Sequence, residues 1–187
     1  LCYLPLYNRN SSLKVMIMRL HIGGTQSKEG WHILNIQPGP DVDFVGSCSD
    51  LSQFKKNSIS EIYASHVFEH LSHREELMGV LADCHNILEP GGQLKISVPD
   101  MVTLSHLFVA DKVTGEQRYE LMLMMFGGHK HENDIHKIGC WEELLSLYLM
   151  NVGFKEPQRV DEFGLFDDYS SQKFEGKSIS LNMIASK

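Results

Sequence analysis

Residues 64–71 read Ala-Ser-His-Val-Phe-Glu-His-Leu, and residues 88–100 read Leu-Glu-Pro-Gly-Gly-Gln-Leu-Lys-Ile-Ser-Val-Pro-Asp. The second segment contains an aliphatic, β-branched run at 94–98 that follows a Pro-Gly-Gly turn and ends at a proline, which predicts a strand. Between the segments, apolar residues recur at helical spacing from Leu77 to Leu88. A crossover of this length is what two parallel strands require.

The same signals extend in both directions along the chain. Further strands are predicted at 19–22, 32–36, 43–45, 58–64, 157–160 and 179–185, each short and most bounded by Gly or Pro. Helices are predicted at 72–88, 102–110, 116–126 and 141–152, the first starting at a capping box formed by Ser72 and Glu75. Residues 127–136 are polar and predict a loop. This mixture indicates an α/β sheet rather than a sandwich.

Composition places the chain among ordinary globular domains. It has 187 residues, of which 42% are hydrophobic and 22% charged, and a formal net charge of -7, which argues against a protein held mainly by phosphate contacts to nucleic acid. Four widely spaced cysteines favour reduced thiols in a cytoplasmic protein. No run approaches the roughly 20 apolar residues of a membrane span. We expect an N-terminal arm at 1–18, without a secretory pattern, and one domain at 19–187.

Candidate ligand-binding residues follow the predicted strands. In open α/β sheets, ligands bind outside the carboxyl ends of the strands. The residues at these ends are Gly23 and Gly24, Gln37, residues 46–51, residues 65–70, and residues 99–100. Gly23-Gly24 would let backbone approach a ligand closely, although the dipeptide alone is equally consistent with a tight turn.

The order of these features resembles the class I S-adenosylmethionine-dependent methyltransferases, specifically small members of the type 11 kind. The most specific marks are Glu69-His70-Leu71 and the Leu-Glu-Pro-Gly-Gly segment at 88–92. The resemblance runs from about Arg19 to the end of the chain. It implies a Rossmann-like sheet that is mostly parallel, has an antiparallel last strand, and binds S-adenosyl-L-methionine.

The resemblance also implies roles for particular residues. Gly23 and Gly24 would accommodate the methionine part of the cofactor, and Gln37 would meet the ribose hydroxyls. Ser47 and Cys48 would lie at the edge of the adenine, and Asp50 and Leu51 would contribute backbone N–H groups and an apolar face to it. Ser65 and His66 would lie near the sulfonium and the acceptor.

Two departures from the family pattern favour a domain that does not catalyse methyl transfer. Gln37 and Ser47 replace the usual carboxylates, which removes charge-assisted hydrogen bonds to the cofactor. Only residues 23–31 connect the first two strands, so the first crossover helix is predicted to be missing or reduced to a turn. An alternative interpretation is therefore a non-catalytic binding or scaffold domain that kept the fold.

Histidines are the candidate catalytic groups. His66 at the strand end is the first candidate for a general base and His136 in the polar loop is the second. Taken separately, each is somewhat better explained by a structural or surface role. His66, Glu69 and His70 could share a helical face, as in some metal-binding methyltransferases that act on RNA ends or quinone precursors. His129, His131 or His136 could add a nitrogen ligand. Because Glu69 and His70 also serve packing in metal-free members, we assign no metal.

The Asp167-Asp168 pair is most simply part of a solvated loop, although it could recognise a polar acceptor such as a sugar. The sequence thus predicts an enzyme that moves a methyl group to an oxygen or nitrogen of a small molecule, for example a glycan or lipid-linked intermediate. One alternative is the non-catalytic domain. The other is a metal-assisted methyltransferase that acts on RNA, and the net negative charge of the chain argues against it. The oligomeric state stays open.

Overall fold

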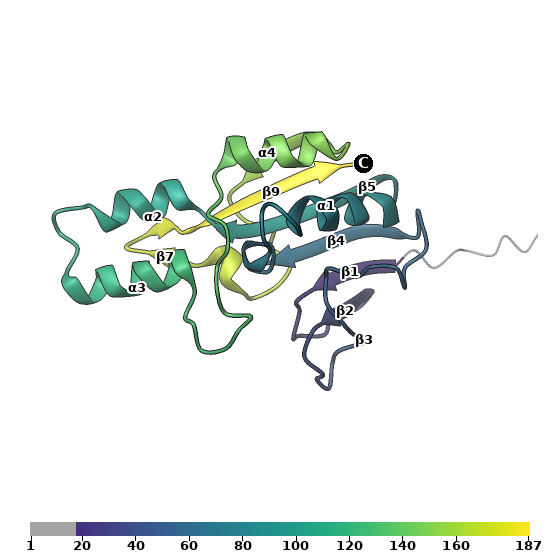
Figure 1. The fold of residues 1–187 in the computed structure, drawn as a ribbon, viewed down its shortest axis with the longest axis horizontal. Helices are drawn as coiled ribbons and strands as arrows, with labels where there is room; N and C mark the ends of the chain where they lie inside the picture. The colour runs from purple at the N-terminus through teal and green to yellow at the C-terminus, as the bar shows by residue number, and fades with distance from the viewer. Residues whose placement is uncertain (1–17) are drawn as a thin grey trace, which may run out of the picture.

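The computed structural model describes residues 18–187 and is built on a seven-stranded sheet of order β3-β2-β1-β4-β5-β9-β6 (Figure 1). The first five strands in this order run parallel, and β9 runs antiparallel to both β5 and β6. The strands are β1 (Met18–Ile22), β2 (Trp31–Asn35), β3 (Phe44–Val45), β4 (Ile59–Ser65), β5 (Leu88–Pro99), β6 (Lys155–Val160) and β9 (Ser180–Ser186). The predicted mostly parallel sheet with an antiparallel last strand is confirmed.

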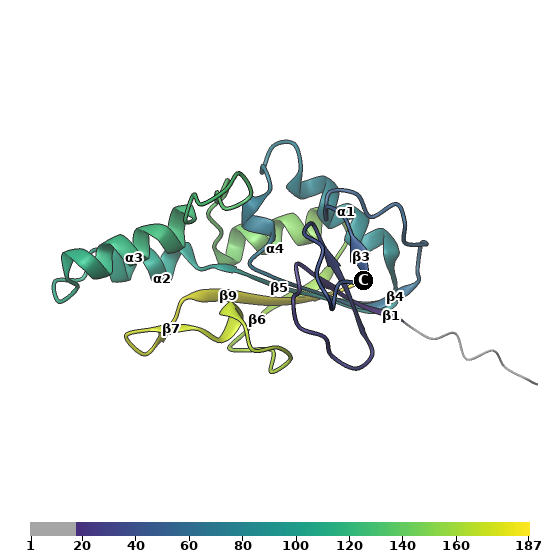
Figure 2. The same ribbon diagram turned by 90° about the horizontal axis from the view of Figure 1, so that it is seen from below.

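The helices form two groups. Helices α1 (Leu77–Ile87) and α4 (Glu142–Asn151) cover one face of the sheet, whereas α2 (Met101–Phe108) and α3 (Gly115–Phe126) pair with each other and extend beyond it (Figures 1 and 2). The main core lies between the sheet and α1 and α4, and it includes Leu20, Ile62 and Leu81, all fully buried. A second apolar cluster holds α2 and α3 together around Leu104 and Leu121.

The start of α1 corrects one prediction. The helix begins at Leu77, so Ser72 and Glu75 form no capping box at its N-terminus. Instead, residues 73–76 form turns, and the Glu76 carboxylate accepts a hydrogen bond from the Ser72 N–H at 2.8 Å. The carboxylate that reaches back is thus one residue later than the capping-box spacing requires, because a turn precedes the helix.

The first crossover has no helix, as predicted. Residues 23–30 connect β1 to β2 through turns and bends, and the described connections from β2 to β3 and from β3 to β4 also lack helices. The expected arm at 1–18 lies outside the described residues except for Met18, which begins β1. Within residues 18–187, no helix is both long and apolar enough to cross a bilayer.

The second face of the sheet is covered in part by residues 161–179, which contain the short 3-10 helix η2 (Tyr169–Ser171) and the hairpin strands β7 (Lys173–Phe174) and β8 (Lys177–Ser178) (Figure 2). The Phe166 ring lies 4.1 Å from the His21 ring and 4.9 Å from the Tyr63 ring, centroid to centroid. The Tyr63 hydroxyl donates to the Asp168 carboxylate at 2.7 Å. These contacts fix the segment beside the carboxyl ends of the strands.

Candidate functional site

A cavity of about 700 Å³ lies at the carboxyl ends of the central strands. Its wall includes Gly23 and Gly24 after β1, Ser65 and His66 at the end of β4, and Pro99 at the end of β5. Residues from α3, from the loop at 127–136 and from the segment 166–172 also line it. This volume is within the range of small-molecule sites, and the position is the one at which open α/β sheets bind ligands.

Of the ten residues given cofactor or catalytic roles from the sequence, the structure brings five together and leaves five others apart. The cavity is lined by Gly23, Gly24, Ser65, His66 and His136. The lining does not include Gln37, Ser47, Cys48, Asp50 or Leu51, which follow β2 and β3. Of these, Gln37 and Asp50 are exposed, whereas the Leu51 side chain is 2% exposed and packs in the main core.

The turn at Gly23 and Gly24 requires glycines because side chains there would collide with neighbouring residues. Gly23 has a φ of 78°, and a Cβ there would collide with the Val67 side chain. A Cβ on Gly24 would lie 2.5 Å from His21 Nδ1. The Asn35 amide donates to the carbonyls of both glycines, at 3.2 and 2.9 Å. The turn is therefore held in a fixed shape from β2, and sequence analysis missed Asn35.

The hydrogen bonds around His66 determine which ring nitrogen carries the proton. His66 Nε2 lies 2.9 Å from Ser180 Oγ, and that hydroxyl donates its single proton to the Tyr169 carbonyl at 2.8 Å. Nε2 must therefore donate to Ser180, which leaves the lone pair of neutral His66 on Nδ1. Nδ1 lies 3.1 Å from Glu69 Oε1. The backbone of His66 has a φ of 53°, a left-handed conformation that is uncommon for residues other than glycine.

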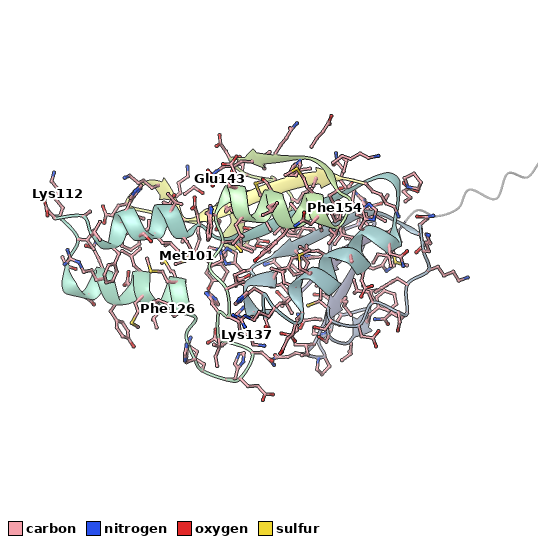
Figure 3. All side chains as sticks on the ribbon, turned by 45° about the horizontal axis from the view of Figure 1, so that its top comes forward. Met101, Lys112, Phe126, Lys137, Glu143 and Phe154 are labelled. Atoms are coloured by element: carbon pink, nitrogen blue, oxygen red, sulfur yellow. The ribbon has the colours of Figure 1, made fainter. Side chains whose placement is uncertain are left out.

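Glu69 is a buried carboxylate with an unusual environment. Its side chain is 1% exposed, and within the described residues neither carboxylate oxygen has a hydrogen-bond donor. The backbone carbonyl oxygen of Glu69 accepts hydrogen bonds from the N–H groups of Lys137 and Ile138, at 2.7 and 3.3 Å. These bonds hold the loop between Phe126 and Lys137, both labelled in Figure 3, against the short 3-10 helix η1 (Phe68–His70) that carries Glu69.

That loop brings a second histidine to Glu69. His136 Nδ1 lies 3.3 Å from the Met125 carbonyl, and His70 Nδ1 lies 3.1 Å from the Ile135 carbonyl. A carbonyl only accepts, so both Nδ1 atoms carry protons, and in each neutral ring the lone pair lies on Nε2. The two rings are 4.9 Å apart. Burial lowers the pKa of His136 below its ordinary value, and the nearby Glu69 carboxylate opposes this only in part.

Sequence analysis found no signal for Phe166 or Tyr169, whereas it considered Asp167 and Asp168 as a contact for a polar acceptor. Phe166, Asp168 and Tyr169 lie in a loop more than 90 residues beyond β4 in the sequence, and only the folded chain places them at the cavity. His21 lines it from β1, where the sequence showed only an ordinary strand position. Alternation along β1 could have shown that His21 points away from the core that contains Leu20 and Ile22.

His21 gives a testable pH dependence. Burial lowers its pKa to about 4, although Asp168 acts in the opposite direction. The unfolded chain takes up this proton near pH 6.5, whereas the folded chain takes it up only near pH 4. The contribution of neutral His21 to the free energy of unfolding is therefore fully present above pH 6.5 and is lost as the pH falls towards 4. We expect a loss of about 3 kcal/mol in the free energy of unfolding across this window.

Urea unfolding of wild-type protein at several pH values measures this slope. His21→Leu should remove the contribution of His21 and make the slope shallower, whereas His131→Ala, at an exposed position in the polar loop, should keep the wild-type slope. A His21→Leu protein with the wild-type slope would contradict the assignment.

The strand order, the antiparallel last strand and the cavity at the strand ends define the class I S-adenosylmethionine-dependent methyltransferase fold. The sequence matches the family described as "Methyltransferase domain" over residues 26–96. The resemblance inferred from the sequence is therefore confirmed for this segment and for the fold. No protein with a curated description matches the chain.

Solved structures of the same fold cover nearly the whole chain. A SAM-dependent methyltransferase from Archaeoglobus fulgidus superposes with a TM-score of 0.59 at 15% identity, covering 92% of this chain and 88% of that one. The 1,6-didemethyltoxoflavin-N1-methyltransferase of Burkholderia thailandensis, solved with its substrate and S-adenosylhomocysteine, gives 0.56 at 15% identity, with coverages of 90% and 70%. A possible histamine N-methyltransferase from Thermotoga maritima gives 0.51 at 14%, with coverages of 91% and 82%.

Proposed function

We propose that this chain is an S-adenosyl-L-methionine-dependent methyltransferase that acts on an oxygen or nitrogen of a small molecule. The observation that carries the proposal is the cavity of about 700 Å³ at the ends of β1, β4 and β5, which the protein's own side chains leave open. The family match over residues 26–96 and the fold support S-adenosylmethionine as the cofactor. The Burkholderia thailandensis enzyme, with substrate and product cofactor bound, shows that this fold holds both.

The cofactor would extend along the strand ends. Gly23, Gly24 and Ser65 would contact its methionine part inside the cavity. The nucleoside would then lie outside the cavity, beside the exposed Gln37 and Asp50 and the half-buried Ser47 and Cys48. Leu51 would contribute only backbone there, because its side chain is buried in the core.

When bound, S-adenosylmethionine supplies an activated methyl group, so the protein must align the acceptor and exclude water. We assign His66 as the base that accepts the acceptor's proton, on Nδ1. Glu69 Oε1, 3.1 Å away, would stabilise the resulting imidazolium. His136 is the second candidate, because its Nε2 keeps a lone pair and its side chain lines the cavity.

Polar groups at the rim support a hydroxyl-rich acceptor such as a glycan or lipid-linked sugar. Asp167 and Asp168 both line the cavity. Asp168 is engaged by Tyr63 and by the backbone of Ser170, whereas Asp167 is exposed and available to a ligand.

One observation favours a second function, a non-catalytic binding domain. The connection between β1 and β2 has no helix, so the helix N-terminus that would supply positive potential and N–H groups near a cofactor is missing there. Affinity for the cofactor separates the two functions.

Calorimetric titration with S-adenosylhomocysteine tests the proposal. We expect a dissociation constant of the order of micromolar, equivalent to about 8 kcal/mol. Gly24→Val should weaken binding, because the new side chain collides with His21 and displaces the turn. A correctly folded wild-type protein that gives no heat at millimolar ligand would establish the binding domain instead.

A further inference from the structure

The cluster of Glu69, His70 and His136 has the donor set of a metal centre. Each residue offers one ligand atom, and these atoms all lie within 4.8 Å of one another. Bonds from nitrogen or oxygen to a transition-metal ion are about 2.1 Å long, so small side-chain rotations would bring the three atoms to one ion. All three residues also line the cavity.

The hydrogen bonds around the cluster leave the histidines ready to bind a cation. His70 and His136 each donate Nδ1–H to a backbone carbonyl, which orients the ring and leaves the lone pair on Nε2. This is the arrangement of outer hydrogen bonds that fixes metal-ligating histidines in proteins. The two carbonyls belong to Ile135 and Met125, so separate segments of the chain hold the two rings.

The carboxylate supplies an independent argument. Glu69 is buried, and within residues 18–187 neither of its oxygens has a hydrogen-bond donor. His66 Nδ1 lies 3.1 Å from Oε1, but the hydrogen bond from Nε2 to Ser180 leaves Nδ1 of the neutral ring without a proton to donate to the carboxylate. A buried anion in this state is costly unless a cation compensates it. A metal ion bound by Glu69 would supply that compensation.

We propose that Glu69, His70 and His136 bind a divalent transition-metal ion. One carboxylate and two imidazoles favour Mn²⁺, Fe²⁺ or Zn²⁺ over Mg²⁺ and Ca²⁺, which prefer all-oxygen surroundings. Three protein ligands leave coordination positions open towards the cavity, as in catalytic metal sites.

The ion also narrows the class of acceptor, a step that rests on the proposed methyl transfer. At the open positions it would hold a hydroxyl or carboxylate oxygen of the acceptor next to Ser65 and His66. A bound hydroxyl loses its proton more readily, which complements a base at His66. We therefore infer an acceptor rich in oxygen atoms rather than an apolar amine.

Metal binding is measured with Mn²⁺ on this chain after chelator treatment, by calorimetry and by electron spin resonance. We expect one ion per chain, bound at least about tenfold more tightly than Mg²⁺. Nitrogen couplings should show imidazole ligands. Glu69→Gln and His136→Ala should each weaken binding by at least about tenfold. His131→Ala removes an exposed imidazole from the same loop and should bind Mn²⁺ as wild type does.

His70→Ala, at a partly exposed position, provides the result if Glu69→Gln does not fold. Wild-type protein that binds no Mn²⁺ at millimolar concentration would overturn the metal site, as would equal binding by wild type and all ligand variants. S-Adenosylhomocysteine titration of the same samples separates the two proposals. Binding of the nucleoside without Mn²⁺ rejects only the metal, and binding of Mn²⁺ without the nucleoside rejects only the methyltransferase.

Discussion

Replacing His66 with asparagine is expected to slow methyl transfer by about 10²–10⁴-fold, the usual contribution of a general base. Asparagine tolerates the left-handed backbone that His66 adopts, with its φ of 53°, so the loss should come from the chemistry rather than from the fold. His66→Ala is expected to be equally slow and additionally less stable, because alanine is strained at this φ.

The measurement is the release of S-adenosylhomocysteine, with the most active acceptor from a panel of hydroxyl- and amine-bearing small molecules. Affinity for S-adenosylhomocysteine should stay close to that of wild type. His106→Asn is the matched control, since His106 is an exposed residue on α2 outside the cavity lining. Wild-type turnover by His66→Asn would remove His66 from the mechanism and leave His136 as the candidate.

Asp100→Ala is expected to lower the free energy of unfolding by about 2–4 kcal/mol, the sum of a lost helix cap and lost charge-assisted hydrogen bonds. Asp100 is buried and caps α2, with Oδ1 accepting from the N–H groups of Val102 and Thr103 at 3.1 and 3.3 Å. Oδ2 accepts from Thr103 Oγ1 at 2.9 Å and from Arg159 at 2.6 Å. One carboxylate thus joins the end of β5, α2 and β6.

Chemical denaturation or thermal unfolding measures this loss, which corresponds to a fall of about 5–15 °C in Tm for a chain of this size. Asp100→Asn keeps one acceptor oxygen for the cap and should lose less. Asp83→Ala, on the exposed side of α1, should stay within about 0.5 kcal/mol of wild type. A loss below 1 kcal/mol for Asp100→Ala would contradict the interpretation that the Asp100 carboxylate holds β5, α2 and β6 together.

The strands and most helices could be predicted because their signals are local. β4, α1 and β5 follow from apolar spacing and from the Gly and Pro residues that bound them. The helix-free first crossover also followed from length alone. The hairpin of β7 and β8 was missed, because two strands of two residues each are too short to give a periodic pattern.

The candidate site could be predicted only where it is built from strand ends. Gly23, Ser65 and His66 follow strands directly, and the cavity includes them. Phe166 and Asp168 come from a distant loop, and no local pattern shows where that loop packs. His136 reaches Glu69 only because backbone hydrogen bonds from Lys137 and Ile138 fix the long loop against η1. Such long-range backbone contacts leave no trace in side-chain spacing.

The hydrogen-bond chain from Tyr169 through Ser180 to His66 has a consequence for the order of events. As long as the Tyr169 carbonyl receives the Ser180 proton, only Nδ1 of His66 can act as a base. A ligand that displaces this carbonyl would free the Ser180 proton, and Nε2 could then become the basic atom. Tyr169 also lines the cavity. A ligand bound against Tyr169 therefore decides whether Nδ1 or Nε2 of His66 is the basic atom. An acceptor bound there would itself decide which of these two nitrogens takes its proton.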